Sequence, residues 1–197
     1  MTNKKPEQRS ADYSIEPLLL NRRSLRAMSG EEVTEQELNQ LFEAARWAPS
    51  CFNAQPWKIF YARRGDQHWQ SYFDLLVEFN QAWCQHAGCL IVLASDTLFP
   101  HNQEFSATHS FDCGAAWQNL ALQGSVMNLV IHGMAGFDYE AAHTLLNLPE
   151  TYQVQAMVAV GHVGDIEQLD ESQHENEVTP SNRNKTDTFV FNGGYQA

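Results

Sequence analysis

A cluster of arginines near the start of the chain is the first candidate for chemistry. The segment Asn21 to Arg26 places Arg22, Arg23 and Arg26 close together around Ser24. A guanidinium group is a planar fork of donors that can bind a phosphate through two hydrogen bonds, and a serine hydroxyl adds another donor. The segment therefore predicts a phosphate site, although the usual role of a charge cluster is a solvated surface.

A polar turn between two prolines is the second candidate. Pro49 is expected to end a helix at Ala48, and Pro56 to hold Gln55 extended, because proline disfavours helix in the residue before it. The turn offers one hydroxyl and two carboxamides, which both donate and accept hydrogen bonds: Ser50, Asn53 and Gln55. These groups suit the polar edge of a flat ligand. A polar turn after a capped helix end is an equal alternative.

Motifs of several other enzyme classes are absent from the sequence. It has no Gly-x-Gly-x-x-Gly after a strand, no Gly-x-x-x-x-Gly-Lys-Ser/Thr loop and no Gly-x-Ser-x-Gly. A Rossmann dinucleotide site, a P-loop and an α/β-hydrolase are therefore not indicated. An arginine clamp together with a carboxamide turn suits a ligand with a phosphate at one end and a flat heteroaromatic ring at the other. Flavin mononucleotide (FMN) has this shape.

Composition limits the class of protein. The chain has 197 residues, 43% of them hydrophobic, and a net charge of −12. This length and composition predict one folded domain, and the negative charge argues against a nucleic-acid partner. No apolar run could span a membrane and no secretory signal is present, so a cytoplasmic protein is expected. The four cysteines and eight histidines have no metal-site or disulfide spacing.

Periodicity and turn signals predict a series of helices and strands. Ser14 to Leu20 is predicted as a short helix capped by Ser14, and Thr34 with Glu37 as the capping box of a second. The other expected helices are an amphipathic segment over 68–86 with Tyr72, Leu75, Leu76 and Phe79 buried, an apolar helix over 111–128, and one that Asp138 caps. The expected strands are 57–62, 89–94, 154–163 and 188–191.

The remaining segments are expected to be irregular. Residues 1–11 are predicted as a flexible leader and 12–197 as a single domain. Phe99 to Ser110 is predicted as a loop and a candidate lid, and Val130 to Phe137 as a turn-rich connection. The acidic stretch Asp165 to Glu177 is interpreted as a solvated connector. Helices that separate the strands predict an α+β or α/β fold around a central sheet.

The two candidate motifs in combination resemble those of the FMN-dependent nitroreductase family. The resemblance rests on Asn21 to Arg26 and on Pro49-Ser50, Asn53 and Gln55-Pro56-Trp57. Shorter matches are Phe79-Asn80, Gln118-Asn119-Leu120, the segment 134–138 and Ala159-Val160-Gly161. The order of these segments is similar to the family from about Tyr13 to the end of the chain.

The resemblance implies an α+β fold with a central, mainly antiparallel sheet flanked by helices. It also implies an intertwined homodimer with FMN at the interface. The implied phosphate and ring contacts are Arg22, Arg23, Ser24, Arg26 and, near the C-terminus, Arg183. The implied contacts from the other subunit are the turn residues Pro49, Ser50, Cys51, Asn53 and Gln55. Asn80 is implied at the pyrimidine side of the ring, and Met134, Ala135 and Gly136 near its redox-active nitrogen.

The sequence departs from the family pattern at two positions. Ser181 stands where a second basic residue often precedes the C-terminal arginine, and Ala135 stands where an acidic residue often precedes the glycine. The implied activity is reduction of nitroaromatics, quinones or similar small-molecule acceptors by NADH or NADPH with ping-pong kinetics, which needs no catalytic side chain. The alternatives are reductive dehalogenation or flavin fragmentation on the same scaffold, and a non-catalytic FMN-binding redox sensor.

Overall fold

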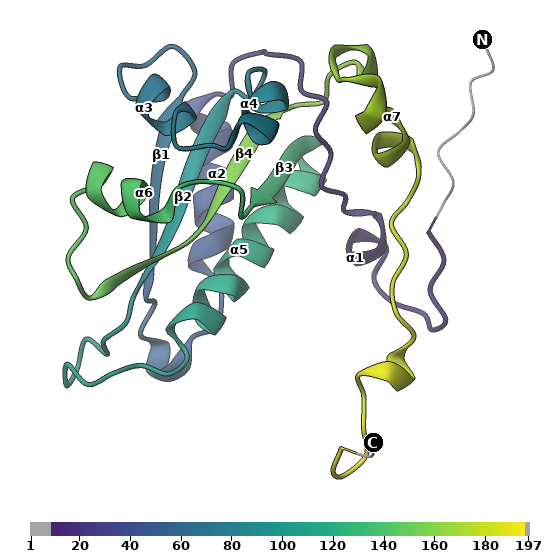
Figure 1. The fold of residues 1–197 in the computed structure, drawn as a ribbon. Helices are drawn as coiled ribbons and strands as arrows, with labels where there is room; N and C mark the ends of the chain where they lie inside the picture. Colours follow the sequence, from purple (N-terminus) through teal and green to yellow (C-terminus); the bar gives the residue numbers. More distant parts are fainter. Residues whose placement is uncertain (1–8, 196–197) are drawn as a thin grey trace.

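A four-stranded antiparallel sheet lies at the centre of the chain. The computed structural model describes residues 9–195. The strands are β1 (Trp57–Arg63), β2 (Cys89–Asp96), β3 (Leu129–Met134) and β4 (Tyr152–His162). They pair in the order β1-β2-β4-β3, and each neighbouring pair is antiparallel (Figure 1). The predicted α+β class and antiparallel sheet are confirmed.

Helices connect the strands and cover both faces of the sheet. They are α1 (Pro17–Asn21), α2 (Glu35–Arg46), α3 (Trp69–Phe73), α4 (Glu78–Cys84), α5 (His109–Val126), α6 (Tyr139–Leu145) and α7 (Glu171–Val178). Short 3-10 turns occupy Cys51–Asn53, Ile166–Gln168 and Thr186–Thr188. No helix within residues 9–195 is long and apolar enough to cross a membrane.

The two faces of β2 belong to two separate parts of the core. Every residue from Cys89 to Ala94 is buried, as predicted for a strand covered on both sides. Ile91 and its neighbours of the same parity pack with α2 and α5, whereas Val92 and its neighbours pack with α3, α4 and α6. The sheet is therefore the middle of three layers, and residues at its edges and ends remain available for a site.

Local sequence signals explain α2, α5 and α6. Thr34 and Glu37 form the predicted capping box of α2, in which each side chain bonds the backbone N–H of the other residue. Asp138 caps α6 by accepting a hydrogen bond from the N–H of Ala141. The small residues of α5 allow close packing: a Cβ at Gly124 would lie 2.1 Å from a side-chain carbon of Ile131.

Several predicted boundaries were wrong in detail. The first helix begins after Glu16, which makes no side-chain cap, and not after Ser14. The segment over 68–86 is divided between α3 and α4, because residues 74–77 leave the helix and bond to the chain at Gly136 and Asp138. Phe79 was predicted to be buried, but it is 60% exposed.

The prediction of a turn-rich connection over 130–137 was wrong, because most of it is strand β3. Gly133, one of the two glycines that make this segment look turn-rich, pairs with Val158 in the sheet. A Cβ at this position would lie 2.9 Å from the Trp117 ring. The glycine therefore marks a close approach of a helix to a strand, which is a recognised role of glycine within strands.

The predictions for the C-terminal third also need correction. The acidic stretch is not a solvated connector, since it forms α7 and buries Gln173 and Glu177. The expected strand over 188–191 does not form, and these residues belong to an exposed arm that descends from the body in Figure 1. Of the predicted leader, residues 1–8 lie outside the described residues.

Candidate functional site

Five arginines surround one cavity beside the first helix. The cavity, of about 400 Å³, is lined by Arg9, Arg22, Arg23, Ser24, Arg26, Glu175, Asn176, Thr179, Pro180, Ser181 and Arg183. These arginines are five of the twelve basic residues in a chain with net charge −12. The predicted arginine segment and Arg183, from opposite ends of the sequence, are therefore brought together at one cavity. Such a concentration of positive charge suits an anion.

The guanidinium groups in this cavity differ in what holds them. Arg22 donates to the hydroxyl of Ser24 at 3.2 Å. Arg23 donates to the carbonyl oxygens of Asn176 and Thr179, at the C-terminal end of α7. A cation at the carbonyl end of a helix is favoured by the helix dipole. Arg23 therefore fastens α7 to the arginine segment, while Arg22 is directed toward the cavity.

The positive charges of these guanidinium groups repel one another, and among the described residues no carboxylate forms an ion pair with any of them. Burial, and after it the positive charge of Arg183, lowers the pKa of both Arg9 and Arg22. None of the ion pairs in the described part of the chain includes a cavity arginine. The Nε atoms of Arg9 and Arg26 are buried and bond to no described residue. A phosphate would relieve the repulsion and supply acceptors.

A buried glutamate of α7 holds the arginine segment from behind. Glu177 Oε1 accepts a hydrogen bond from the backbone N–H of Arg26 at 2.8 Å, and Oε2 accepts from Ala27 at 3.4 Å. The side chain is 8% exposed. Sequence reasoning missed Glu177, because it lies in an acidic run that is otherwise typical of a solvated surface.

Histidine 132 of β3 supports the same segment from the sheet. Its Nδ1 lies 2.8 Å from the carbonyl oxygen of Leu25 and donates to it, and its ring lies 4.6 Å from that of Trp83. Burial lowers the pKa of His132 to about 4, although the bond to Leu25 opposes the shift. The imidazole is therefore neutral at pH 7 and does not add charge to the cavity.

The second part of the predicted site lies where α4 meets the end of β3. Arg26 lies over the rings of Phe79 and Trp83, 6.0 and 5.8 Å from their centres. Directly after Phe79 on the same helix, Asn80 donates from Nδ2 to the carbonyl of Gly136 at 2.9 Å. The predicted residues Asn80, Met134, Ala135 and Gly136 are thus neighbours, and Arg26 connects them to the arginine cavity.

Glycine is required at position 136 by this arrangement. A Cβ there would lie 2.7 Å from Asn80 Nδ2 and 3.0 Å from a methyl group of Val77. Met134 is buried, whereas Ala135 is exposed. A side chain at 136 would therefore displace the Asn80 carboxamide, and the absence of one lets α4 approach the end of β3.

The polar turn over 49–55 has a different conformation from the one predicted. Gln55 is not extended: its φ is +50°, and Phe52 and Asn53 are also left-handed. The hydroxyl of Ser50 accepts the N–H of Gln55 at 3.0 Å, and Gln55 Nε2 donates to the carbonyl of Asn53. These local bonds offset the conformational cost of left-handed backbone, which is considerable for a phenylalanine.

A buried aspartate fixes this turn to α5. Asp112 Oδ2 accepts the N–H of Cys51 at 3.0 Å and the hydroxyl of Thr108 at 3.2 Å. Phe52 is 80% exposed and makes edge contacts with Phe99 and His101 of the following loop. The predicted candidate lid over 99–110 therefore contains a loop that packs on the turn, and α5 begins within it at His109.

Within one chain the turn and the arginine cavity lie apart. Figure 1 shows the turn before β1 at the lower end of α5, whereas α4 and the end of the arginine segment lie near the upper end of the sheet. The turn residues Pro49, Ser50, Cys51, Asn53 and Gln55 do not border the arginine cavity. The fourteen predicted site residues thus form two groups.

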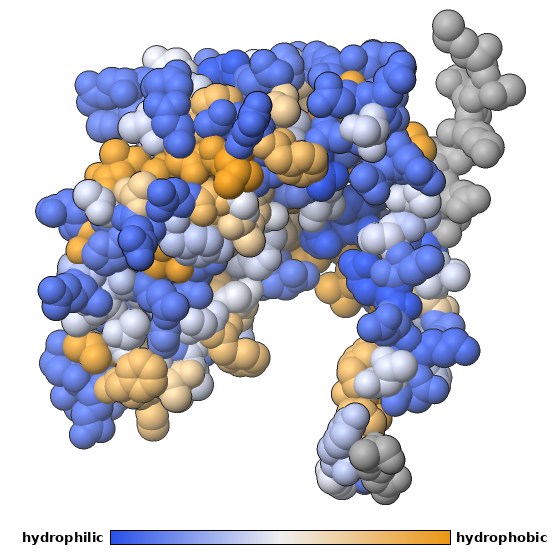
Figure 2. All heavy atoms as spheres, viewed as in Figure 1, coloured by the Kyte–Doolittle hydropathy of each residue, from blue (hydrophilic) through white to orange (hydrophobic). Residues whose placement is uncertain are grey.

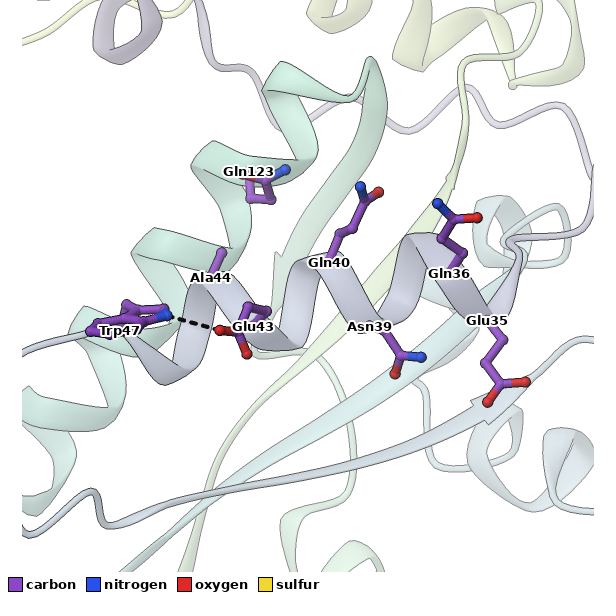
Figure 3. A pocket seen from close by; sticks show the side chains of 8 residues that line it. All are labelled: Glu35, Gln36, Asn39, Gln40, Glu43, Ala44, Trp47 and Gln123. Carbon is purple, nitrogen blue, oxygen red and sulfur yellow. Dashed lines mark hydrogen bonds between the residues drawn. The ribbon is translucent and has the colours of Figure 1, made fainter.

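A hollow larger than the arginine cavity lies at neither group. It measures about 810 Å³ and lies along α2 beside α5, as Figure 3 shows. Its lining is mostly carboxamide and carboxylate side chains, and Trp47 Nε1 donates to Glu43. We regard the smaller arginine cavity as the functional candidate, because its charge is opposite to that of the protein and two of its buried donors lack partners among the described residues.

Two features define the structural class of this protein. One is the antiparallel sheet between helical layers, and the other is the arginine cavity beside helix α1. A model of the family described as "Nitroreductase family" matches residues 19–162. The chain belongs to the nitroreductase family.

Individual relatives agree with this assignment. NADH dehydrogenase of Thermus thermophilus is 29% identical over 174 residues, which cover 73% of this chain and 83% of the relative. A solved structure described as an oxidoreductase containing FMN is 36% identical, covers 100% of this chain and 99% of its own, and has a TM-score of 0.91. A nitroreductase family protein from Streptococcus pneumoniae is 18% identical, with coverages of 89% and 98% and a TM-score of 0.70, and it shows likeness of fold alone.

Proposed function

We propose that the protein is an FMN-dependent oxidoreductase that takes hydride from NADH or NADPH and reduces nitroaromatics, quinones or similar acceptors. The observation that carries the proposal is the arginine cavity, which concentrates five guanidinium groups on an acidic protein. The similar structure of an FMN-containing oxidoreductase and the relative named NADH dehydrogenase support the choice of flavin and of nicotinamide.

The residues of the cavity fit the phosphate end of FMN. Arg22 and Arg183 would bind the phosphate, and the buried, unpartnered Nε of Arg26 would donate to the ligand. Arg23 would help indirectly by holding α7 in place, and Ser24 by holding the Arg22 guanidinium group. The isoalloxazine ring would extend from the cavity toward Asn80 and the segment 134–136. Arg26 lies between the two places, since it lines the cavity and lies over the Phe79 ring of α4.

Bound FMN would supply the redox chemistry, by accepting a hydride and passing electrons to the next substrate in a ping-pong sequence. The protein's own contribution is binding, orientation and exclusion of water. Asn80 presents a carboxamide that is fixed by its bond to Gly136, and so can position a polar ring edge. His132 is held neutral, and Ala135 adds no carboxylate. In this proposal we assign no side chain the role of acid or base.

A second copy of the chain would complete the site and form an intertwined homodimer. The turn does not border the cavity of its own chain, and in this proposal a partner would bring its own turn to the ring: Pro49, Ser50, Cys51, Asn53 and Gln55. Exposed apolar side chains support such an interface: Phe111 and Val126 on α5, and Phe189 and Val190 on the arm. Figure 2 shows a hollow between the body and the arm that a partner could fill.

Cofactor analysis and anaerobic reduction test the proposed function. Mass spectrometry of the cofactor released from purified protein should identify FMN, and either NADH or NADPH should bleach the flavin absorption without oxygen. FAD or no flavin would contradict the proposal. FMN that neither nicotinamide reduces would favour the redox-sensor alternative. Reduced flavin that turns over only halogenated or flavin substrates would favour the other enzymatic alternatives.

Sedimentation tests the proposed dimer independently. At low micromolar concentration we expect a single dimeric species, because obligate dimers rarely have a stable folded monomer. A monomer that retains FMN would contradict the shared site.

A further inference from the structure

Arg9 brings a guanidinium group to the cavity from outside both predicted motifs. It precedes α1, yet its Nη1 donates to the carbonyl oxygen of Arg22 at 2.6 Å and its Nη2 donates to the hydroxyl of Ser181 at 2.9 Å. Arg183 Nη1 donates to the same hydroxyl oxygen at 3.0 Å. Two guanidinium groups, from segments near opposite ends of the chain, therefore meet at one oxygen atom.

Such a meeting of like charges is unfavourable without an anion. Among residues 9–195, no ion pair includes Arg9 or Arg183, and the acidic side chain in the cavity lining is the exposed Glu175. Arg9 Nε is buried and has no partner among these residues, which leaves a charged donor unused. Burial is the larger cause of the lowered pKa of Arg9, and repulsion from Arg183 is the next. These observations indicate a ligand that both guanidinium groups share.

We propose that Arg9 is a further phosphate-binding residue, which pairs with Arg183 to bind the terminal phosphate of a flavin nucleotide. The inference rests on the proposed function and extends it to a residue outside the motifs. A phosphate monoester carries nearly two charges and three acceptor oxygens at pH 7, so it can accept from two arginine forks at once. Ser181, which accepts from both arginines, holds the two forks in position.

The competing role for Arg9 is a purely structural one. Its bonds to the carbonyl oxygens of Leu20 and Arg22 could simply fasten the segment before α1 to the segment after it. The two roles differ in what they require of the ligand. A phosphate contact acts on FMN and not on riboflavin, which has the same ring system and no phosphate. A fastening role would affect both ligands through the shape of the site.

The test is fluorescence titration of apo-protein with FMN and, separately, with riboflavin. The variants are Arg9→Ala and Arg9→Lys, which keeps the charge and loses the fork. Arg63→Ala is the matched control, because Arg63 lies at the edge of the sheet and forms only a distant surface pair with Glu32. Circular dichroism confirms that each variant is folded.

We expect Arg9→Ala to weaken FMN binding roughly ten- to hundredfold and to leave riboflavin binding unchanged. Arg9→Lys should show a smaller loss for FMN, and Arg63→Ala none. Unchanged FMN affinity in Arg9→Ala, or equal losses for FMN and riboflavin, would overturn the assignment of Arg9. A parent protein that binds neither flavin, or that binds riboflavin at least as tightly as FMN, would instead refute the proposed function.

Discussion

Replacing Glu177 with glutamine tests whether α7 holds the arginine segment in place. The carboxylate accepts hydrogen bonds from the N–H groups of Arg26 and Ala27. In Glu177→Gln the amide oxygen can keep the bond to Arg26, but the amide NH₂ then faces the N–H of Ala27, so two donors meet. Loss of one charge-assisted bond and an unsatisfied buried donor together cost about 2 kcal/mol. For a domain of this size, that lowers the unfolding temperature by about 4–8 °C.

Thermal unfolding of the apo-protein, followed by FMN titration, measures both consequences. Glu177→Gln should unfold at a lower temperature and bind FMN more weakly, because the hydrogen bond to Arg26 loses its charge assistance and the one to Ala27 is lost. Glu175→Gln is the matched control on the same helix: its side chain is exposed and lines the cavity, so stability should stay constant and FMN affinity should not fall. A Glu177→Gln protein that unfolds at the parent temperature would refute the reasoning.

Three further predictions concern the cavity, the turn and the sheet. Arg22→Ala should weaken FMN binding roughly ten- to hundredfold in a titration of apo-protein, since a charge-assisted bond is lost; parent-like affinity would place Arg22 on a solvated face. Asn53→Ala should reduce turnover more than FMN affinity in steady-state assays, because the turn shapes the ring end; an equal loss in both would contradict this. His132→Phe should flatten the dependence of unfolding free energy on pH. The folded pKa of about 4 lies below the unfolded value of about 6.5, so only the unfolded chain binds a proton between them, and parent stability is full above pH 6.5 and falls by up to ~3 kcal/mol toward pH 4. Denaturant unfolding at pH 7 and pH 4.5 measures how much unfolding free energy each protein loses between the two pH values. Equal losses in the parent and in His132→Phe would exclude His132 as the cause.

Sequence patterns predicted the elements whose signals are local. Helix α2 followed from Thr34 and Glu37, which form its capping box. Strand β2 was predicted from its apolar run, because a strand that is buried on both faces reads as continuous apolar residues and not as alternating polar and apolar ones. Strand β3 was missed because Gly133 serves the packing of Trp117 and not a turn. A single sequence does not distinguish these two uses of glycine.

The candidate site was predictable where it lies in continuous motifs and not where distant segments meet. Arg22 and Arg26 belong to one short segment of arginines, so residue type and spacing alone were sufficient to make them candidates for an anion site. Arg9 and Glu177 act through contacts with residues 13 and 151 positions away. Gln55 shows a further limit: the proline after it predicts extended backbone, but the hydroxyl of Ser50 captures its N–H and the chain turns left-handed.

A crystal structure of the FMN-loaded protein would test the central claim most directly. We predict the phosphate between Arg22 and Arg183, the ring beside Asn80 and Gly136, and the turn that contains Ser50 and its neighbours from a second copy of the chain at the ring. Flavin bound elsewhere on the chain, or a complete flavin site within a single subunit, would contradict the account.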